Sequence, residues 1–225
     1  MDCQQRKCCP IARHGPRPDQ GRADVAFYHG EQGGAERVTQ RLFGKKLTRC
    51  EYATLAGAPR DALLEVGTWR GQLYLELRGT PMRLFQAVLR VRRGENGPVL
   101  VEDGFCFSHP SMQGKHLGRR VFHRQLCCAQ ALGIVGVETF AERRPDDNGY
   151  YHWPRFGFDG PLSAALRRKL PEELAVARRV LDLMRSRAGR QWWRRHGVAM
   201  RVRFDMAEES RSWQVLRRHL GPAGT

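Results

Sequence analysis

The chain contains, near its middle, the stretch Phe105-Cys-Phe-Ser-His-Pro-Ser-Met-Gln-Gly-Lys-His-Leu-Gly118. It predicts a strand that ends at His109-Pro110, a loop of small residues and a helix that begins near Leu117. The N–H groups of such a loop and of the helix N-terminus have no partners within the helix, and the helix dipole adds positive potential there. The junction is therefore a predicted anion-binding site.

The residues before this junction predict an antiparallel meander. Residues 73–77 alternate between apolar and polar side chains, and apolar runs follow at 84–91 and 99–107. Short turns, such as the one at 94–98, favour antiparallel pairing of the strands they join. Gly104 lies inside the last run and predicts a β-bulge.

The residues after the junction predict a helix and then another strand. Apolar residues recur on one helical face from Leu117 to Leu132, and Gly133 is placed to end the helix. Residues 134–140 form a short apolar strand, so strand, helix and strand make a βαβ unit with parallel neighbours. The predicted fold class is α/β (α+β): an antiparallel meander, then a βαβ unit, then extra C-terminal helices.

Two helices and a strand are predicted in the C-terminal part. Pro171-Glu-Glu favours a helix start, with Leu174, Leu181 and Met184 as the buried face. Residues 198–204 alternate as a strand does. Asp205-Met-Ala-Glu208 has the pattern of a capping box for a last helix.

Composition indicates a globular protein of 225 residues with 41% apolar and 28% charged side chains. Residues 1–22 lack periodicity and predict a mobile basic tail, and residues 23–225 are interpreted as a single domain. Neither a membrane-spanning run nor a secretory leader is recognised, so we expect a cytoplasmic protein without membrane contact. Seven cysteines favour reduced thiols, and the spacing of Cys3, Cys8, Cys9 and His14 matches no common zinc finger, so no metal is expected.

The net charge of +16 has two possible origins. Only five of the 39 basic residues are lysine, which is typical of a GC-rich genome. However, residues 162–225 carry 15 basic and six acidic side chains, and charge concentrated in this way favours RNA or another polyanion as a partner.

The motif Gln113-Gly-Lys-His-Leu-Gly118 resembles the pyrophosphate loop of the GNAT acetyltransferase superfamily, Arg/Gln-x-x-Gly-x-Gly/Ala. Pro110 precedes it where that family often carries proline, and Asn148 followed by Gly157-Phe158 resembles the family's fourth-helix region. His116 departs from the pattern, because it occupies the first signature glycine. The resemblance implies a GNAT-like fold and an acyl-coenzyme A co-substrate, with acetyl-coenzyme A as the first choice.

The same resemblance implies the site residues. Those expected to bind the co-substrate are Phe107, Gln113, Gly114, Lys115, His116, Leu117, Gly118, Arg119 and Asn148. The backbone N–H of Phe107 would stabilise the oxyanion, and Tyr151 would protonate the leaving thiolate. Because a primary amine is mostly protonated at neutral pH, a base is needed, and Glu102, Asp103 and Glu138 are the candidates.

Three functions remain open from the sequence. The leading prediction is an N-acyltransferase whose acceptor is an amine on a small molecule or a protein. The second is a catalytically silent GNAT-like module, or another basic module, that binds nucleic acid through the C-terminal arginines, with Trp192-Trp193 able to stack on bases. The third is a transferase for polyamines or aminoglycosides, which an acidic cleft would favour.

Overall fold

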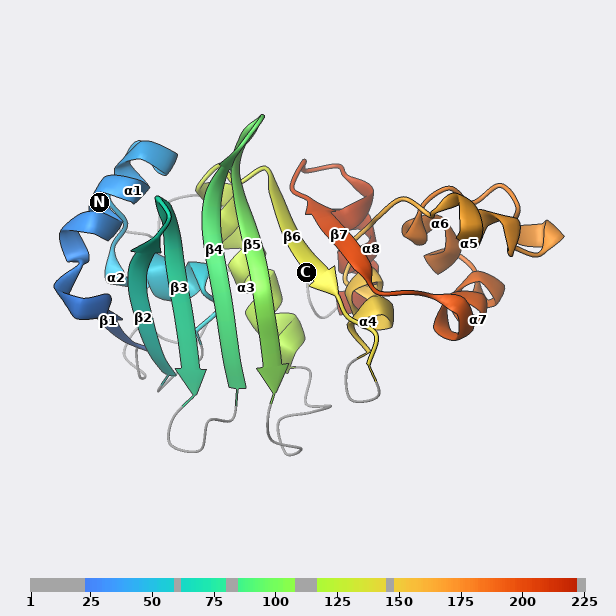
Figure 1. Cartoon of the computed structure of the whole chain (residues 1–225), viewed down its shortest axis with the longest axis horizontal. Helices are drawn as coiled ribbons and strands as arrows, with labels where there is room; N and C mark the ends of the chain where they lie inside the picture. The colour runs from blue at the N-terminus through green and yellow to red at the C-terminus, as the bar shows by residue number, and fades with distance from the viewer. Residues whose placement is uncertain (1–22, 59–61, 80–84, 108–116, 145–147, 222–225) are drawn as a thin grey trace. The chain divides into compact units, whose positions relative to one another are not determined.

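The computed structural model describes residues 23–58, 62–79, 85–107, 117–144 and 148–221 (Figure 1). They form a mixed α/β protein with two compact units, the first ending at Val135 and the second beginning at Gly136. The predicted tail, residues 1–22, lies outside the described residues. The single domain and the parallel pairing within the βαβ unit stay predictions.

The first unit contains five strands that neighbour one another in sequence order. They are β1 (Asp24–Phe27), β2 (Ala62–Trp69), β3 (Gln72–Gly79), β4 (Phe85–Gly94) and β5 (Gly97–Phe107). β1 runs parallel to β2, and β2 to β5 are antiparallel. The predicted meander is confirmed, and it is one strand longer because β2 was not recognised in the sequence.

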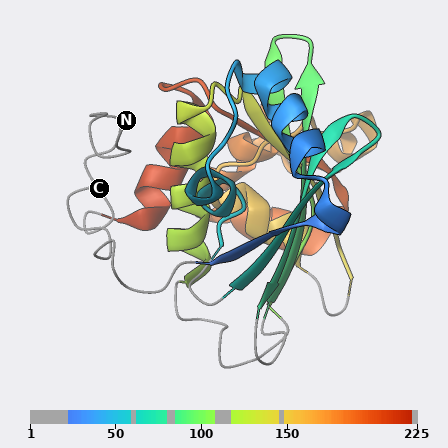
Figure 2. The same ribbon diagram turned by 90° about the vertical axis from the view of Figure 1, so that its left-hand side faces the viewer.

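Three helices pack with this sheet: α1 (Gln32–Phe43), α2 (Arg49–Leu55) and α3 (Leu117–Ala131). α2 and α3 lie side by side behind the sheet (Figures 1 and 2), and α1 contacts β2 and β3. The sheet face that they cover is apolar, with Leu64, Leu75, Leu89 and Leu100 almost fully buried. Gly133, at φ +73°, follows the end of α3, as predicted.

The second unit pairs β6 (Gly136–Ala141) with β7 (Met200–Asp205) in antiparallel fashion. Its helices are α4 (Gly149–Arg155), α5 (Ala164–Arg168), α6 (Val180–Met184), α7 (Arg187–His196) and α8 (Arg211–Leu220). Trp193, on α7, is fully buried in an apolar cluster with residues of α5 and α6. Its indole N–H donates to the Tyr150 carbonyl oxygen at 2.8 Å, so α7 is fixed to α4.

Of the two helices predicted in this unit, the first is wrong, and the last is confirmed as α8 but begins later than its predicted capping box. After Pro171 the chain makes only a 3₁₀ turn, Glu172–Leu174, and becomes extended at Arg179 before α6 begins. The expected apolar residues are buried nonetheless. The last helix is capped by Ser210, whose hydroxyl accepts from the Trp213 N–H, whereas the Asp205 carboxylate accepts from Ala207 in the preceding turn.

Candidate functional site

A β-bulge in β5 separates two adjacent carboxylates. Val88 is paired with Gly104 and Leu89 with Glu102. Asp103, between them, is therefore an extra residue with no residue opposite it on β4. The bulge predicted at Gly104 is therefore confirmed. Residues directly paired across strands share a sheet face, so Glu102 lies with the buried Leu89, and Asp103 points to the other face.

Glu102 is a buried carboxyl group with an unusual proton affinity. Its side chain belongs to a residue that is 3% exposed, and its Oε2 atom has no hydrogen-bond partner among the described residues. Burial, and secondarily the charge of Asp103, raises the pKa of Glu102 from its ordinary 4.5 to about 8. A group with this pKa exchanges its proton near neutral pH, as a general base requires.

Asp103 is committed to an ion pair. Arg90, on β4, donates to both carboxylate oxygens of Asp103, with Nη2 to Oδ1 at 2.6 Å. The same guanidinium donates to Gln72 at 3.3 Å and lies 5.3 Å from the Trp69 ring centroid. Because both oxygens already accept hydrogen bonds, Asp103 is better suited to positioning Arg90 than to accepting a proton.

Asp103 and Arg90 line a pocket of about 470 Å³ on the sheet face opposite the helices. Its lining is aromatic and acidic, and comprises Tyr28, Glu31, Gly67, Thr68, Trp69, Tyr74, Arg90 and Asp103. Gly67 is needed where the strand passes Tyr28, because an added Cβ would approach the tyrosine Cβ to 3.1 Å. The pocket therefore lies between β2 to β5 and the residues that precede α1.

Glu31 is the carboxylate in this pocket that is free to meet a ligand. It is exposed, accepts a hydrogen bond from the Thr68 hydroxyl at 3.2 Å, and has no basic partner among the described residues. Trp69 is 45% exposed and carries Arg70 at 4.5 Å from its ring centroid. With Asp103 neutralised by Arg90, the pocket retains one uncompensated negative charge beside aromatic rings, which suits a single ammonium group.

Sequence reasoning missed this pocket because it missed β2. The signal was present: Arg70 and Gly71 both have positive φ, at 49° and 73°, and form a two-residue hairpin turn. An Arg-Gly pair between two alternating runs predicts such a turn. Recognising it would have paired Gly67 with Tyr74 and placed Trp69 on the same sheet face as Tyr74.

The residues expected to cradle a pyrophosphate are described only in part. Gln113, Gly114, Lys115 and His116 lie outside the described residues. Leu117, Gly118 and Arg119 form the first turn of α3, where backbone N–H groups lack intrahelical acceptors, so their amides are available for the predicted role. Phe107 is the last residue of β5, opposite Phe85.

The remaining predicted residues belong to the second unit. Glu138, on β6, accepts a hydrogen bond from the Arg203 guanidinium at 3.0 Å. Because its carboxylate is engaged in this ion pair, Glu138 is less suited to act as a base. Tyr151 lies on α4, with the Arg155 and Arg194 guanidinium carbons 5.8 and 5.9 Å from its ring centroid. Asn148 is exposed and precedes α4, and its side chain makes no capping hydrogen bond.

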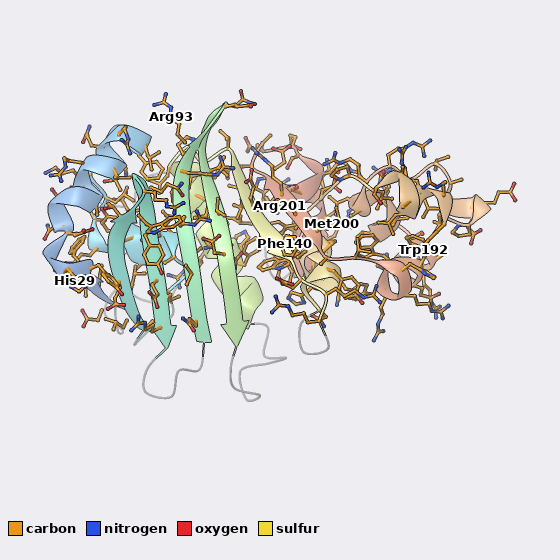
Figure 3. The ribbon with its side chains drawn as sticks, in the orientation of Figure 1. His29, Arg93, Phe140, Trp192, Met200 and Arg201 are labelled. Carbon is orange, nitrogen blue, oxygen red and sulfur yellow. The ribbon has the colours of Figure 1, made fainter. Side chains whose placement is uncertain are left out.

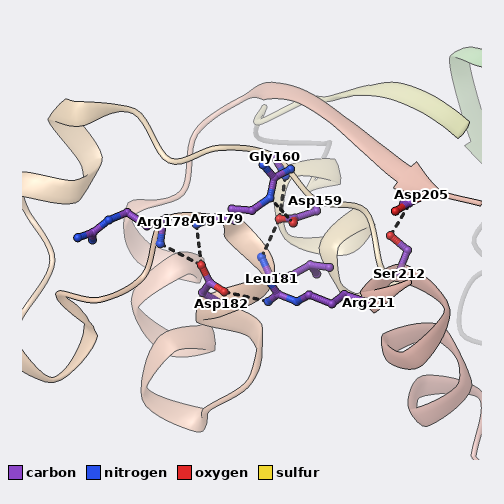
Figure 4. Close-up of polar contacts among 9 residues, drawn as sticks. All are labelled: Asp159, Gly160, Arg178, Arg179, Leu181, Asp182, Asp205, Arg211 and Ser212. Carbon is purple, nitrogen blue, oxygen red and sulfur yellow. Dashed lines mark hydrogen bonds and ion pairs between the residues drawn. The ribbon is translucent and has the colours of Figure 1, made fainter. Parts of the chain in front are cut away.

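A second pocket, of about 440 Å³, lies within the second unit and is lined by three arginines. Each is held by a carboxylate: Arg179 by Asp159 at 2.6 Å, Arg203 by Glu138 at 3.0 Å and Arg211 by Asp182 at 2.9 Å (Figure 4 shows the first and third). Asp159 also accepts from the Gly160 and Leu181 amides. These contacts join α6, β7 and α8, so the pocket's arginines are structural.

The Asp182 carboxylate illustrates this neutralisation. Burial favours its neutral form, but the amides of Arg178 and Arg179 and the side chain of Arg211 outweigh burial and lower the pKa of Asp182. Its two amide contacts are both 2.9 Å long. The carboxylate therefore stays charged and keeps Arg211 paired.

The described residues offer neither a metal-binding cluster nor a membrane-spanning helix. They contain no group of three or more His, Cys, Asp and Glu side chains that could hold a metal ion. Within the same residues, no helix is long and apolar enough to cross a bilayer. Comparisons with protein-family models and with curated proteins found no match to the chain. The residues of the chain itself are therefore the basis for assigning a function.

Proposed function

We propose that this protein is an acyl-coenzyme A-dependent N-acyltransferase, with acetyl-coenzyme A as the donor and a small primary amine as the acceptor. The observation that carries the proposal is Glu102, a buried carboxyl group with a pKa of about 8 on the helix-covered face of β5. Support also comes from the order of elements, since the antiparallel meander leads through residues 108–116 into α3.

The proton affinity of Glu102 matches its proposed task. An alkylammonium group has a pKa near 10, so transfer of its proton to an ordinary carboxylate is strongly uphill. Raising the acceptor's pKa from 4.5 to about 8 makes that transfer about 5 kcal/mol less unfavourable. Glu102 then holds the proton while the neutral amine acts as the nucleophile.

The other residues have roles in the same reaction. Acetyl-coenzyme A supplies the acyl group as an activated thioester. The Phe107 N–H donates to the oxygen that becomes negative in the transition state, and the leaving thiolate takes its proton from solvent. The pocket that Glu31 and Asp103 line lies on the other face of the sheet from Glu102, so its residues take no part in this proton transfer.

Donor binding is tested first, by calorimetric titration with acetyl-coenzyme A. We expect micromolar binding that weakens at least tenfold in Gly118→Val, because a branched side chain holds the ligand away from the backbone amides. Gly33→Val is the matched control. Gly33 lies in α1, and a Cβ added there would have Arg37 Nη1 as its nearest atom, at an ordinary contact distance of 3.5 Å. Absence of acetyl-coenzyme A binding to the unmodified protein refutes the proposed function.

Turnover is tested by measuring thiol release with a panel of small primary amines. For the unmodified protein, kcat/KM should rise with pH until about pH 8, because Glu102 must be ionised to accept a proton. Glu102→Gln should lower kcat by about 10²-fold or more and remove this dependence. Equal rates in Glu102→Gln and the unmodified protein would reject Glu102 as the base.

A further inference from the structure

The second unit carries its excess positive charge in two different settings. Its residues 136–221 include 18 basic and 11 acidic side chains. The arginines of its pocket are paired with carboxylates, as described above. A different set surrounds two tyrosines of α4, and we call Arg143, Tyr150, Tyr151, Arg155 and Arg194 the tyrosine–arginine surface.

The three arginines of the tyrosine–arginine surface are exposed and form no ion pair with any described carboxylate. Arg143 donates to the backbone carbonyl oxygens of Gly197 and Arg195, the latter at 3.1 Å, and its charge is not neutralised by these contacts. Among the described residues, Arg155 and Arg194 lie against the Tyr151 ring and pair with no carboxylate. This surface therefore presents three uncompensated guanidinium groups.

Aromatic rings lie between these cations. Arg143 is 4.9 Å from the Tyr150 ring centroid, and the Tyr150 and Tyr151 centroids are 6.5 Å apart. Guanidinium planes and phenol rings both stack on nucleobases, and guanidinium groups bind phosphates through two parallel hydrogen bonds. Alternation of the two along one surface is the arrangement that a single strand with unstacked bases requires.

The backbone beneath the surface is fixed by several contacts. The Tyr150 hydroxyl donates to the Arg194 carbonyl oxygen at 2.8 Å, and the buried Trp193 indole donates back to the Tyr150 carbonyl oxygen. Position 197 requires glycine, because an added Cβ would lie 2.6 Å from the Trp193 carbonyl oxygen. The side chains are thus presented from a preorganised frame, which lowers the entropy lost on binding.

A similar pair lies on the strands that α4 contacts. Phe140 on β6 is paired with Arg201 on β7, and the two lie side by side (Figure 3). Phe140 is 46% exposed, and Arg201 has no ion-pair partner among the described residues. Trp193, which the sequence left open as a residue that could stack on bases, cannot do so because it is fully buried. Trp192 is half-buried on α7 and packs on His196.

We propose that the tyrosine–arginine surface binds single-stranded nucleic acid, with phosphates on Arg143, Arg155 and Arg194 and a base stacked at Tyr151. This activity is separate from acyl transfer and does not depend on it. A duplex would fit less well, since its bases are already stacked on one another and are not available to the Tyr151 ring. A polysulfate could bind the guanidinium groups, but it has no bases to stack on the tyrosine rings.

The test is fluorescence anisotropy with a labelled 12-nucleotide RNA, using DNA of the same sequence, the corresponding duplex and heparin as further probes. We expect the single strands to bind at least tenfold more tightly than the duplex. The logarithm of the binding constant should fall with the logarithm of salt concentration at a slope of about −2, as expected for three phosphate contacts to a single strand. Binding to duplex or heparin that equals binding to the single strands overturns the proposal.

Charge-matched variants locate the surface. The double variant Arg155→Gln, Arg194→Gln should weaken single-strand binding at least tenfold and reduce the salt slope by about 1.4. The control Arg167→Gln, Arg168→Gln removes the same charge from exposed positions on α5 and should change binding less than threefold. Equal losses in the two double variants would show a general charge effect and overturn the proposed location.

Two further measurements test whether Tyr151 stacks on a base and whether RNA binding is independent of acetyl-coenzyme A. Tyr151→Phe should retain single-strand binding and Tyr151→Leu should lose it at least threefold, because only the former keeps the ring. Saturating acetyl-coenzyme A should leave RNA bound. Displacement of RNA by acetyl-coenzyme A would refute a separate surface, whereas failure of acetyl-coenzyme A to bind at all would refute only the proposed acyltransferase function.

Discussion

Replacing Glu102 with glutamine should change how the stability of the protein depends on pH. The substitution keeps the shape of the side chain and removes its ionisation. The folded protein holds the Glu102 proton more tightly than the unfolded chain does, because its pKa is about 8 when folded and about 4.5 when unfolded. The free energy of unfolding should therefore fall as the pH rises from about 4.5, and this loss should be complete above about pH 8.

The size of the effect follows from the same two values. Their difference, multiplied by about 1.4 kcal/mol for each pH unit, gives a loss of about 5 kcal/mol across the full range. Between pH 5 and pH 8 the loss should be about 3 to 4 kcal/mol, since the ends of the range are only partly titrated. In Glu102→Gln this contribution should be absent. The free energy of unfolding of the variant, relative to that of the unmodified protein, should therefore increase as the pH rises.

Guanidinium chloride unfolding, followed by tryptophan fluorescence at pH 5, 6, 7, 8 and 9, measures this difference. Glu95→Gln is the control, because Glu95 is an exposed carboxyl group in the turn between β4 and β5. Parallel pH profiles for Glu102→Gln and the unmodified protein would show that Glu102 ionises normally, and the argument for it as a base would then fail.

Two other predictions concern backbone and imidazole groups. Gly157→Ala should lower the free energy of unfolding by more than about 1 kcal/mol, because Gly157 has φ +98° and an added Cβ would lie 2.3 Å from the Ser212 carbonyl oxygen. Gly104→Ala, which meets no atom within 4 Å, should change it by less than about 0.5 kcal/mol in the same denaturation assay. Burial lowers the pKa of His123, so its NMR titration midpoint should lie below 6.5 and the stability that depends on it should decline as the pH falls below 6.5; a midpoint at or above 6.5 would contradict this.

Local patterns predicted those elements whose side chains face one environment throughout. Residues 73–77 alternate strictly, and Leu73, Leu75 and Leu77 are fully buried in β3. Gly104 predicted the bulge because an isolated glycine in a strand weakens regular pairing. The carboxylate at Glu102 was predicted as a candidate base, but its burial was not, because only the bulge determines which of two adjacent acids turns toward the core.

Tertiary contacts decided the elements that local patterns mispredicted. Asp205 and Glu208 fit a capping box, yet the Asp205 amide is engaged by the Ser212 hydroxyl at 3.0 Å and the helix starts later. β2 was missed because Leu63 and Gly67 interrupt its alternation, and it is held as a strand by pairing with both β1 and β3. The ion pairs that neutralise the arginines of the second pocket could not be predicted from local sequence either, since Arg211 and Asp182 are 29 residues apart.

The bulge in β5 also determines where the chain tolerates a change in length. Asp103 faces no residue on β4, so deleting it would leave every cross-strand pair of β4 and β5 in place. Deletion of one residue elsewhere in β5 would move all the side chains beyond it to the opposite face of the sheet. Related sequences that differ in length within this strand should therefore have gained or lost their residue at position 103, together with the need for a cation at position 90.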